Sequence, residues 1–292
     1  MLVVKDSVMK IASVLHKAEL ADFPACKECP WSPKKSEDVA FGVSCPEHGV
    51  NWKEINQANS MTIVQDPADT TPQETGMLCA IHNAKNPTDK TAQQDFELWK
   101  ATVSLDSFSA ETGGYMKSHY WTNAIMHGAT SSSGLRKSTL SMARQCCTEV
   151  LAFQIMALQP KVVIAKGKVA VGSLYDIGLI KHPWDVLRHE FRKGAYKETV
   201  ANWRGLKNIT VFCTYHTSAR VVNQTLSKQY NEQEEIEELI EIKLKALPNK
   251  DSIDYFLKKY NDIKNNSRDK GMRYLLNHWL DIGAVLRACS WL

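Results

Sequence analysis

The chain has 292 residues and a mass of 32.9 kDa, which suits one large domain with an appendage or two smaller domains. Its hydrophobic content of 43% and charged content of 23% exclude a wholly disordered or fibrous protein. No apolar run approaches the ~20 residues of a membrane span. The net charge of +4 permits a polyanionic partner without requiring one. We expect a cytoplasmic monomer with no membrane partner.

The N-terminal part of the chain predicts a helix followed by an irregular segment. Residues 1–20 place Lys5 and Lys10 among apolar residues and lack a small-residue cleavage site, which favours an amphipathic helix over a signal peptide. Residues 25–57 are rich in Cys, Pro, Gly and Trp. The chain contains eight cysteines, and in a cytoplasmic protein they favour metal or redox chemistry over a disulfide framework.

Short apolar runs alternate with helical patterns along the middle of the chain. Strands are predicted at 61–64, 120–126, 162–165 and 209–214, and helices at 142–158 and 169–177. Such strands separated by helices are typical of a parallel sheet covered on both faces. Three further helical patterns follow, at 231–246, 251–264 and 270–289. The sequence therefore predicts an α/β core over residues 1–228, built on a central, mostly parallel sheet and including the Cys-rich segment. A helical C-terminal extension follows over residues 229–292.

Polar residues follow or end each predicted strand. They are Gln65-Asp66-Pro67, Thr122-Asn123, Lys166-Gly167-Lys168 and His216-Thr217-Ser218. In an open α/β sheet the ligand crevice lies beyond the carboxyl ends of the strands, so these side chains are expected at one edge. Each segment also has an ordinary structural interpretation. Asp-Pro starts turns, Asn123 is typical of a satisfied core amide, Lys166-Gly167-Lys168 of a strand-to-helix turn with solvated ends, and His216 of a helix cap.

Together these segments resemble the uracil-DNA glycosylase superfamily. The likeness covers roughly residues 20–228, is strongest from Tyr120 to Ser218, and is absent from the C-terminal helices. It implies that Asp66 assists attack of water at the sugar C1′ or stabilises the cationic transition state. It also implies that Asn123 reads the edge of a flipped base and that His216 stabilises the leaving base. It further implies a base pocket that includes Gln65, Ala68, Met77 and Leu78, and DNA contacts by Lys166, Gly167, Lys168, Ser218 and Arg220.

The resemblance implies a monofunctional DNA glycosylase that flips a pyrimidine out of DNA and leaves an abasic site. Ala68 stands where the best-known uracil enzymes place a Tyr, and no aromatic residue occurs at 74–78. The pocket is therefore expected to accept uracil or a bulkier pyrimidine such as glucosylated hydroxymethylcytosine, as in phage-defence members of the superfamily. Two alternatives remain open: a non-catalytic DNA-binding protein on the same scaffold, and a hydrolase of free nucleosides or nucleotides.

The cysteines resemble the iron–sulfur branch of that superfamily. Cys26 and Cys29 form a Cys-x2-Cys pair, and Cys147 matches a later ligand, whereas His127 stands where another Cys is expected. The preferred set is a 4Fe-4S cluster held by Cys26, Cys29, Cys45 and Cys147, with a structural role. A zinc site that uses Cys26, Cys29, Cys45 and His48 is the alternative on spacing. Buried thiols without a ligand are the ordinary reading.

Overall fold

The computed structural model describes residues 23–30, 58–65, 119–126, 133–216, 233–247, 250–265 and 272–290. The strands in these ranges are β1 (Ser60–Val64), β2 (His119–Asn123), β3 (Val162–Lys166), β4 (Tyr196–Trp203) and β5 (Leu206–Thr214). The α-helices are α2 (Pro24–Glu28), α6 (Ser133–Cys146), α7 (Thr148–Leu158), α8 (Gly167–Asp176), α9 (Trp184–Leu187), α11 (Gln233–Lys245), α12 (Lys250–Asn265) and α13 (Met272–Ser290). A short 3₁₀ helix, η6 (Glu190–Arg192), precedes β4.

The strands form one five-stranded sheet in the order β2-β1-β3-β5-β4. Neighbouring strands among β2, β1, β3 and β5 are parallel, and only β4 runs antiparallel to its neighbour. Every residue of β1 and β3 is buried, as expected for strands covered on both faces. The predicted α/β fold with a mostly parallel sheet is therefore confirmed.

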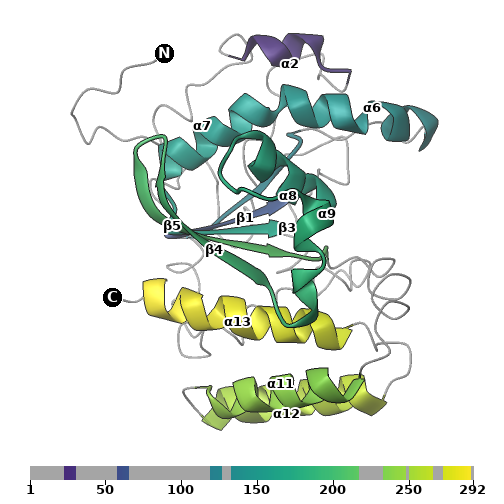
Figure 1. Ribbon diagram of the computed structural model, residues 1–292, viewed down its shortest axis with the longest axis vertical. Coiled ribbons are helices and arrows are strands. Elements are labelled where there is room, and N and C mark those ends of the chain that lie inside the picture. Colours follow the sequence, from purple (N-terminus) through teal and green to yellow (C-terminus); the bar gives the residue numbers. More distant parts are fainter. Residues whose placement is uncertain are drawn as a thin grey trace, which may run out of the picture.

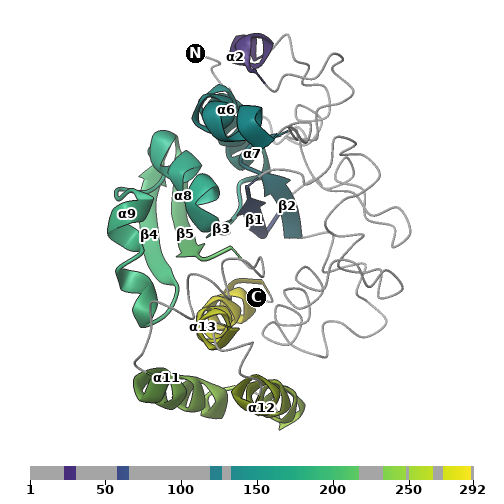
Figure 2. The ribbon, with the colours of Figure 1, turned by 90° about the vertical axis from the view of Figure 1, so that its right-hand side faces the viewer.

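Helices cover the two faces of the sheet in separate layers. Figures 1 and 2 show α6, α7 and α8 on one side of the sheet and α13 on the other, with α11 and α12 outside α13. Helix α2 lies beside α6. The predicted helical C-terminal extension is thus present, and α13 packs directly on the sheet through β5. Among the described helices, none is both long and apolar enough to cross a membrane.

The helix predicted over 142–158 is divided in the structure. Helix α6 ends at Cys146 and α7 begins at Thr148, with Cys147 between them at a ψ of −1°. The Cys147 N–H lies 3.2 Å from the Ala143 carbonyl and 3.1 Å from the Arg144 carbonyl, so the hydrogen-bond pattern tightens without reversing the chain. Apolar periodicity continues across the junction, which is why the sequence indicates one helix there.

Strand β4 was not predicted, and it pairs with a longer β5 than the expected 209–214. The two strands form a hairpin in which Trp203 pairs with Leu206. Both turn residues have positive φ, +48° at Arg204 and +90° at Gly205, as a type I′ turn requires. Because β4 lies at the sheet edge and its outward residues are exposed, its polar sequence lacks the apolar run that marks the other strands.

Candidate active site

The carboxyl ends of four parallel strands bring the described motif residues to one edge of the sheet. Val64 pairs with Asn123, and Lys166 pairs with Thr214. Gln65 and Gly167 follow directly from β1 and β3, and His216 lies two residues after the end of β5. The predicted gathering of these segments at one edge is therefore present for the residues that the structure describes.

Gly167 and His216 are in direct contact across this edge. A Cβ atom added to Gly167 would lie 2.9 Å from the Cβ of His216, and Gly167 has a φ of +88°. A side chain at position 167 would thus be strained by its backbone conformation and would meet a rigid atom of the neighbouring segment. Gly167, the first residue of α8, is what permits the chain after β5 to pass so closely.

The end of β2 is held by a buried polar network that includes Gln154 of α7. Tyr120 Oη and Thr122 Oγ1 both donate to Gln154 Oε1, at 3.1 and 2.8 Å. Gln154 Nε2 in turn donates to Met126 Sδ at 3.2 Å. Burial raises the pKa of Tyr120, which keeps its hydroxyl protonated as a donor. The network fixes the chain on both sides of Asn123, which is itself buried.

Strands β1 and β2 remain joined beyond their last ladder pair. The Ala124 N–H donates to the Val64 carbonyl at 2.8 Å, and the Ile125 N–H donates to the Gln65 carbonyl at 3.0 Å. Gln65 is therefore fixed by its backbone alongside the segment that follows Asn123. Asp66, the next residue, lies outside the described residues.

The two lysines beside Gly167 occupy different environments. Lys168 is exposed, whereas Lys166 is only 1% exposed, with its Nζ 5.4 Å from the centre of the Trp279 ring of α13. Burial lowers the pKa of Lys166 to about 7. The expected phosphate contact by Lys166 is not compatible with this burial, because the side chain does not reach the surface. Lys168 remains a candidate for that contact.

The three described cysteines of the expected metal site are buried and come from two parts of the fold. Cys26 and Cys29 lie in and just after α2, and Cys147 lies at the junction of α6 and α7. Burial raises the pKa of Cys147, with smaller contributions from the nearby thiols of Cys29, Cys26 and Cys146. Burial also raises the pKa of Cys26, so the thiols of Cys26 and Cys147 are favoured in their protonated form when no positive charge is present.

The described residues were also searched for groups of side chains that could bind a metal ion. In the ranges that the structure covers, no three or more His, Cys, Asp or Glu side chains are arranged to hold one metal ion. The remaining expected site residues lie outside those ranges, namely Ala68, Met77, Leu78, Ser218, Arg220, Cys45, His48 and His127.

Comparison with known proteins assigns the family. No curated protein matches the chain. The family model described as the uracil DNA glycosylase superfamily matches residues 57–241, which is more than half of the sequence and includes all five strands of the sheet. The chain belongs to the uracil-DNA glycosylase superfamily.

Proposed function

We propose that the protein is a monofunctional DNA glycosylase that flips a pyrimidine out of DNA and hydrolyses its N-glycosidic bond. The observation that supports this proposal is that Asn123, Gly167 and His216 follow or end parallel strands at the same carboxyl edge of the sheet, in a chain of this superfamily. In an open sheet this edge is where ligands bind.

The chemistry requires stabilisation of opposite charges on the two sides of the breaking bond. As the bond between the base nitrogen and the sugar C1′ breaks, the sugar becomes cationic and the base becomes anionic. Asp66 stabilises the sugar and directs a water molecule, whose oxygen forms the new bond to C1′ while its proton passes to Asp66 and finally to the released base. His216 stabilises the departing base, and Asn123 pairs with its edge. Such preorganised groups often supply the largest catalytic contribution. Contacts between the pocket and the flipped base also offset the free energy that is lost when the base leaves the stack.

The substrate that we propose is uracil or a pyrimidine with a larger substituent at carbon 5. Ala68 has a smaller side chain than the Tyr of the best-known uracil enzymes and would leave more room in the base pocket. Residues 74–78 contain no aromatic ring. A glucosylated hydroxymethylcytosine would use that additional space. Excision of such a base from phage DNA would give the protein an antiviral role.

A panel of DNA substrates tests the activity directly. Oligonucleotides that contain uracil, thymine, 5-hydroxymethylcytosine or its glucosylated form are incubated with the protein, and abasic sites are then cleaved with alkali. Strand cleavage that depends on the alkali step is expected with at least one substrate. Full-length strands from every substrate would reject the glycosylase. Salt-sensitive binding without an abasic product would support the DNA-binding alternative, and product from mononucleotides alone would support the nucleotide hydrolase.

Replacement of Gly167 with alanine is expected to lower both stability and excision, because the new methyl group would press on His216. A positive φ costs roughly 1–2 kcal/mol for a residue with a side chain. Gly205→Ala is the matched control, since Gly205 has a φ of +90° but no atom within 4 Å of an added Cβ. Thermal unfolding should show a loss in both variants, whereas the excision rate should fall only in Gly167→Ala. Equal excision rates in the two variants would contradict the importance of this contact.

We further propose that the buried thiols hold a structural 4Fe-4S cluster through Cys26, Cys29, Cys147 and Cys45. The burial of the three described thiols and their mutual influence on pKa support this set. When bound, the cluster would supply the positive charge that favours thiolates and would join α2 to the α6–α7 junction.

The metal content of the purified protein tests this proposal. Protein prepared without oxygen should be brown and contain iron and sulfide, and Cys147→Ala should lose both. Cys213→Ala is the control, because Cys213 is equally buried but lies in β5. A colourless protein with one zinc ion per chain would favour the alternative site at Cys45 and His48. Equal iron content in Cys147→Ala and wild type would exclude Cys147 as a ligand.

A further inference from the structure

Helix α13 lies outside the family match yet contacts the strand that leads to His216. The match ends at residue 241, whereas α13 spans Met272–Ser290 and packs against β5. The sheet edge that carries the proposed activity is therefore supported by a helix that the family model does not include.

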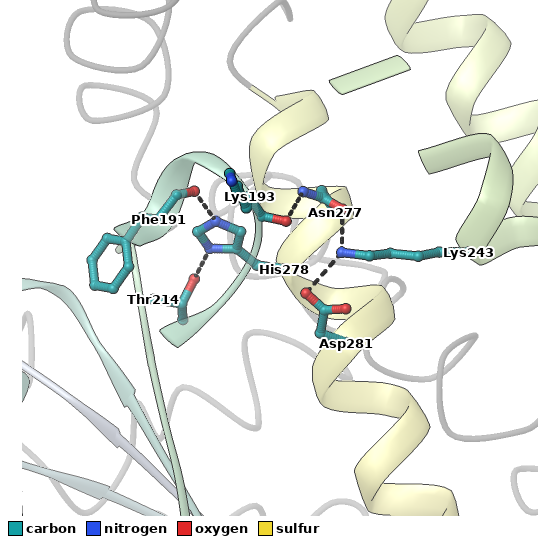
Figure 3. Close-up of polar contacts among 7 residues, drawn as sticks. All are labelled: Phe191, Lys193, Thr214, Lys243, Asn277, His278 and Asp281. Atoms are coloured by element: carbon teal, nitrogen blue, oxygen red, sulfur yellow. Dashed lines mark hydrogen bonds and ion pairs between the residues drawn. The ribbon is translucent and has the colours of Figure 1, made fainter. Parts of the chain in front are cut away.

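A buried histidine of α13 forms hydrogen bonds in two directions. His278 Nδ1 lies 2.7 Å from Thr214 Oγ1, and His278 Nε2 lies 2.8 Å from the carbonyl oxygen of Phe191 (Figure 3). Because a carbonyl only accepts, Nε2 carries the proton, and the Thr214 hydroxyl donates to Nδ1. The neutral ring of His278 thus joins the last residue of β5 to the short helix η6.

The same ring also packs on the residue that follows Thr214. The rings of Tyr215 and His278 are stacked, with their centroids 5.9 Å apart and an angle of 17° between their planes. Phe191 and Trp184 contact Tyr215 edge to face, with centroids at 5.0 and 5.7 Å. His278 therefore fixes two successive residues, one by a hydrogen bond and the other by stacking, immediately before His216.

Further polar contacts fix α13 itself. Asn277 Nδ2 donates to the Lys193 carbonyl at 3.1 Å, and Lys243 of α11 binds Asn277 Oδ1 at 2.5 Å and Asp281 Oδ2 at 2.8 Å (Figure 3). These contacts hold the helix against both α11 and the segment before β4. They do not involve Thr214 or Tyr215, so they offer a control that loosens α13 without removing the link to β5.

We propose that His278 is a positioning residue that orients His216 through Thr214 and Tyr215. This inference rests on the proposed glycosylase function, in which His216 must face the departing base. A misplacement of about 1 Å in a group of this kind can lower a rate by roughly a hundredfold. Only Tyr215 separates Thr214 from His216, so a shift of Thr214 would also move His216. Helix α13 therefore contributes to the geometry of the active site.

Replacement of Thr214 with valine tests the hydrogen bond while it preserves the shape of the side chain. We expect the single-turnover excision rate to fall roughly tenfold to a hundredfold with little change in KM, because DNA binding does not depend on this bond. Thr214→Ser restores the hydroxyl and should recover most of the rate. Lys243→Met is the control for a merely structural role. An unchanged rate in Thr214→Val, or an equal loss in Lys243→Met, would overturn the proposal.

Nuclear magnetic resonance of the His216 ring provides a readout that does not require activity. The ring signals of His216 and their titration should change in Thr214→Val, and should match wild type in Thr214→Ser and Lys243→Met. Unchanged His216 signals in Thr214→Val would overturn the positioning role even if excision occurs. An inactive wild-type protein would reject the glycosylase, while the His216 signals would still decide the positioning role. If Thr214→Val does not fold, His278→Phe replaces it: it keeps a ring beside Tyr215 but removes the acceptor for Thr214, so its His216 signals should change, and unchanged signals would overturn the positioning role.

Discussion

Replacement of His216 with alanine is expected to lower the rate of base excision by about 10²–10³, the usual effect of removing one positioned donor. His216 lies just beyond β5, with its Cβ close to Gly167 at the ligand-binding edge of the sheet. Without it, negative charge on the departing base would develop with less stabilisation. The single-turnover rate on the best substrate of the panel measures the effect. His182→Ala is the control, since His182 is exposed and lies in another part of the chain.

Asp66→Asn should cause a loss of the same order, because an amide cannot neutralise the cationic sugar. The binding of DNA by either variant should remain near that of wild type, since phosphate contacts provide most of the affinity. A His216→Ala or Asp66→Asn protein as active as wild type would contradict the proposed mechanism. Weaker binding with an unchanged rate would instead assign these residues to DNA contact.

When the pH is lowered from 6.5 to 4, the free energy of unfolding of the wild-type protein is expected to fall by about 3 kcal/mol more than that of a variant without His278. Burial lowers the pKa of His278 to about 4, although its hydrogen bond to the Phe191 carbonyl acts in the opposite direction. The unfolded chain takes up a proton on this residue near pH 6.5, whereas the folded protein does so only near pH 4. Unfolding in this range therefore binds a proton and becomes more favourable as the pH falls.

His278→Gln provides the comparison, because glutamine does not titrate. Urea unfolding of both proteins at several pH values between 4 and 7 measures the two free energies of unfolding. Lys243 and Asp281, which lie nearby, are present in both proteins, so most of their own pH dependence cancels in the difference. Parallel curves across this range would show that His278 is protonated in the folded protein or is not buried in solution.

Local patterns in the sequence were sufficient for much of the sheet. The apolar runs at Met61 and Val162 predicted β1 and β3, because a strand covered on both faces needs apolar side chains on both sides. Strand β4 was missed since an edge strand with one exposed face keeps polar residues. Its turn, Arg204-Gly205, also lacks the Asn-Gly or Asp-Gly pair that usually marks a tight hairpin.

The residues of the site were predictable only as a set of strand ends. Asn123, Gly167 and His216 each follow or end an apolar run, so a parallel sheet brings them to the same edge. The burial of Lys166 could not be predicted in this way, because lysine is usually solvated. The ring that lies over its Nζ, that of Trp279, belongs to a helix far away in the sequence. The polar contacts of Gln154 with β2 were also not predicted, because a single amide in an otherwise apolar helix is only a weak indication of such a role.

The sequence alone determined the parallel sheet, the helical extension and the segments that meet at its edge, because hydrophobic periodicity and strand ends are local properties of the chain. Only the tertiary structure decided that α13 docks on β5 and places His278 against Thr214, a residue 64 positions earlier. That contact depends on the shapes of two packed surfaces. No pattern in the sequence of β5 or of α13 predicts that the two segments are in contact. The hydrogen bond forms only once the whole core has assembled.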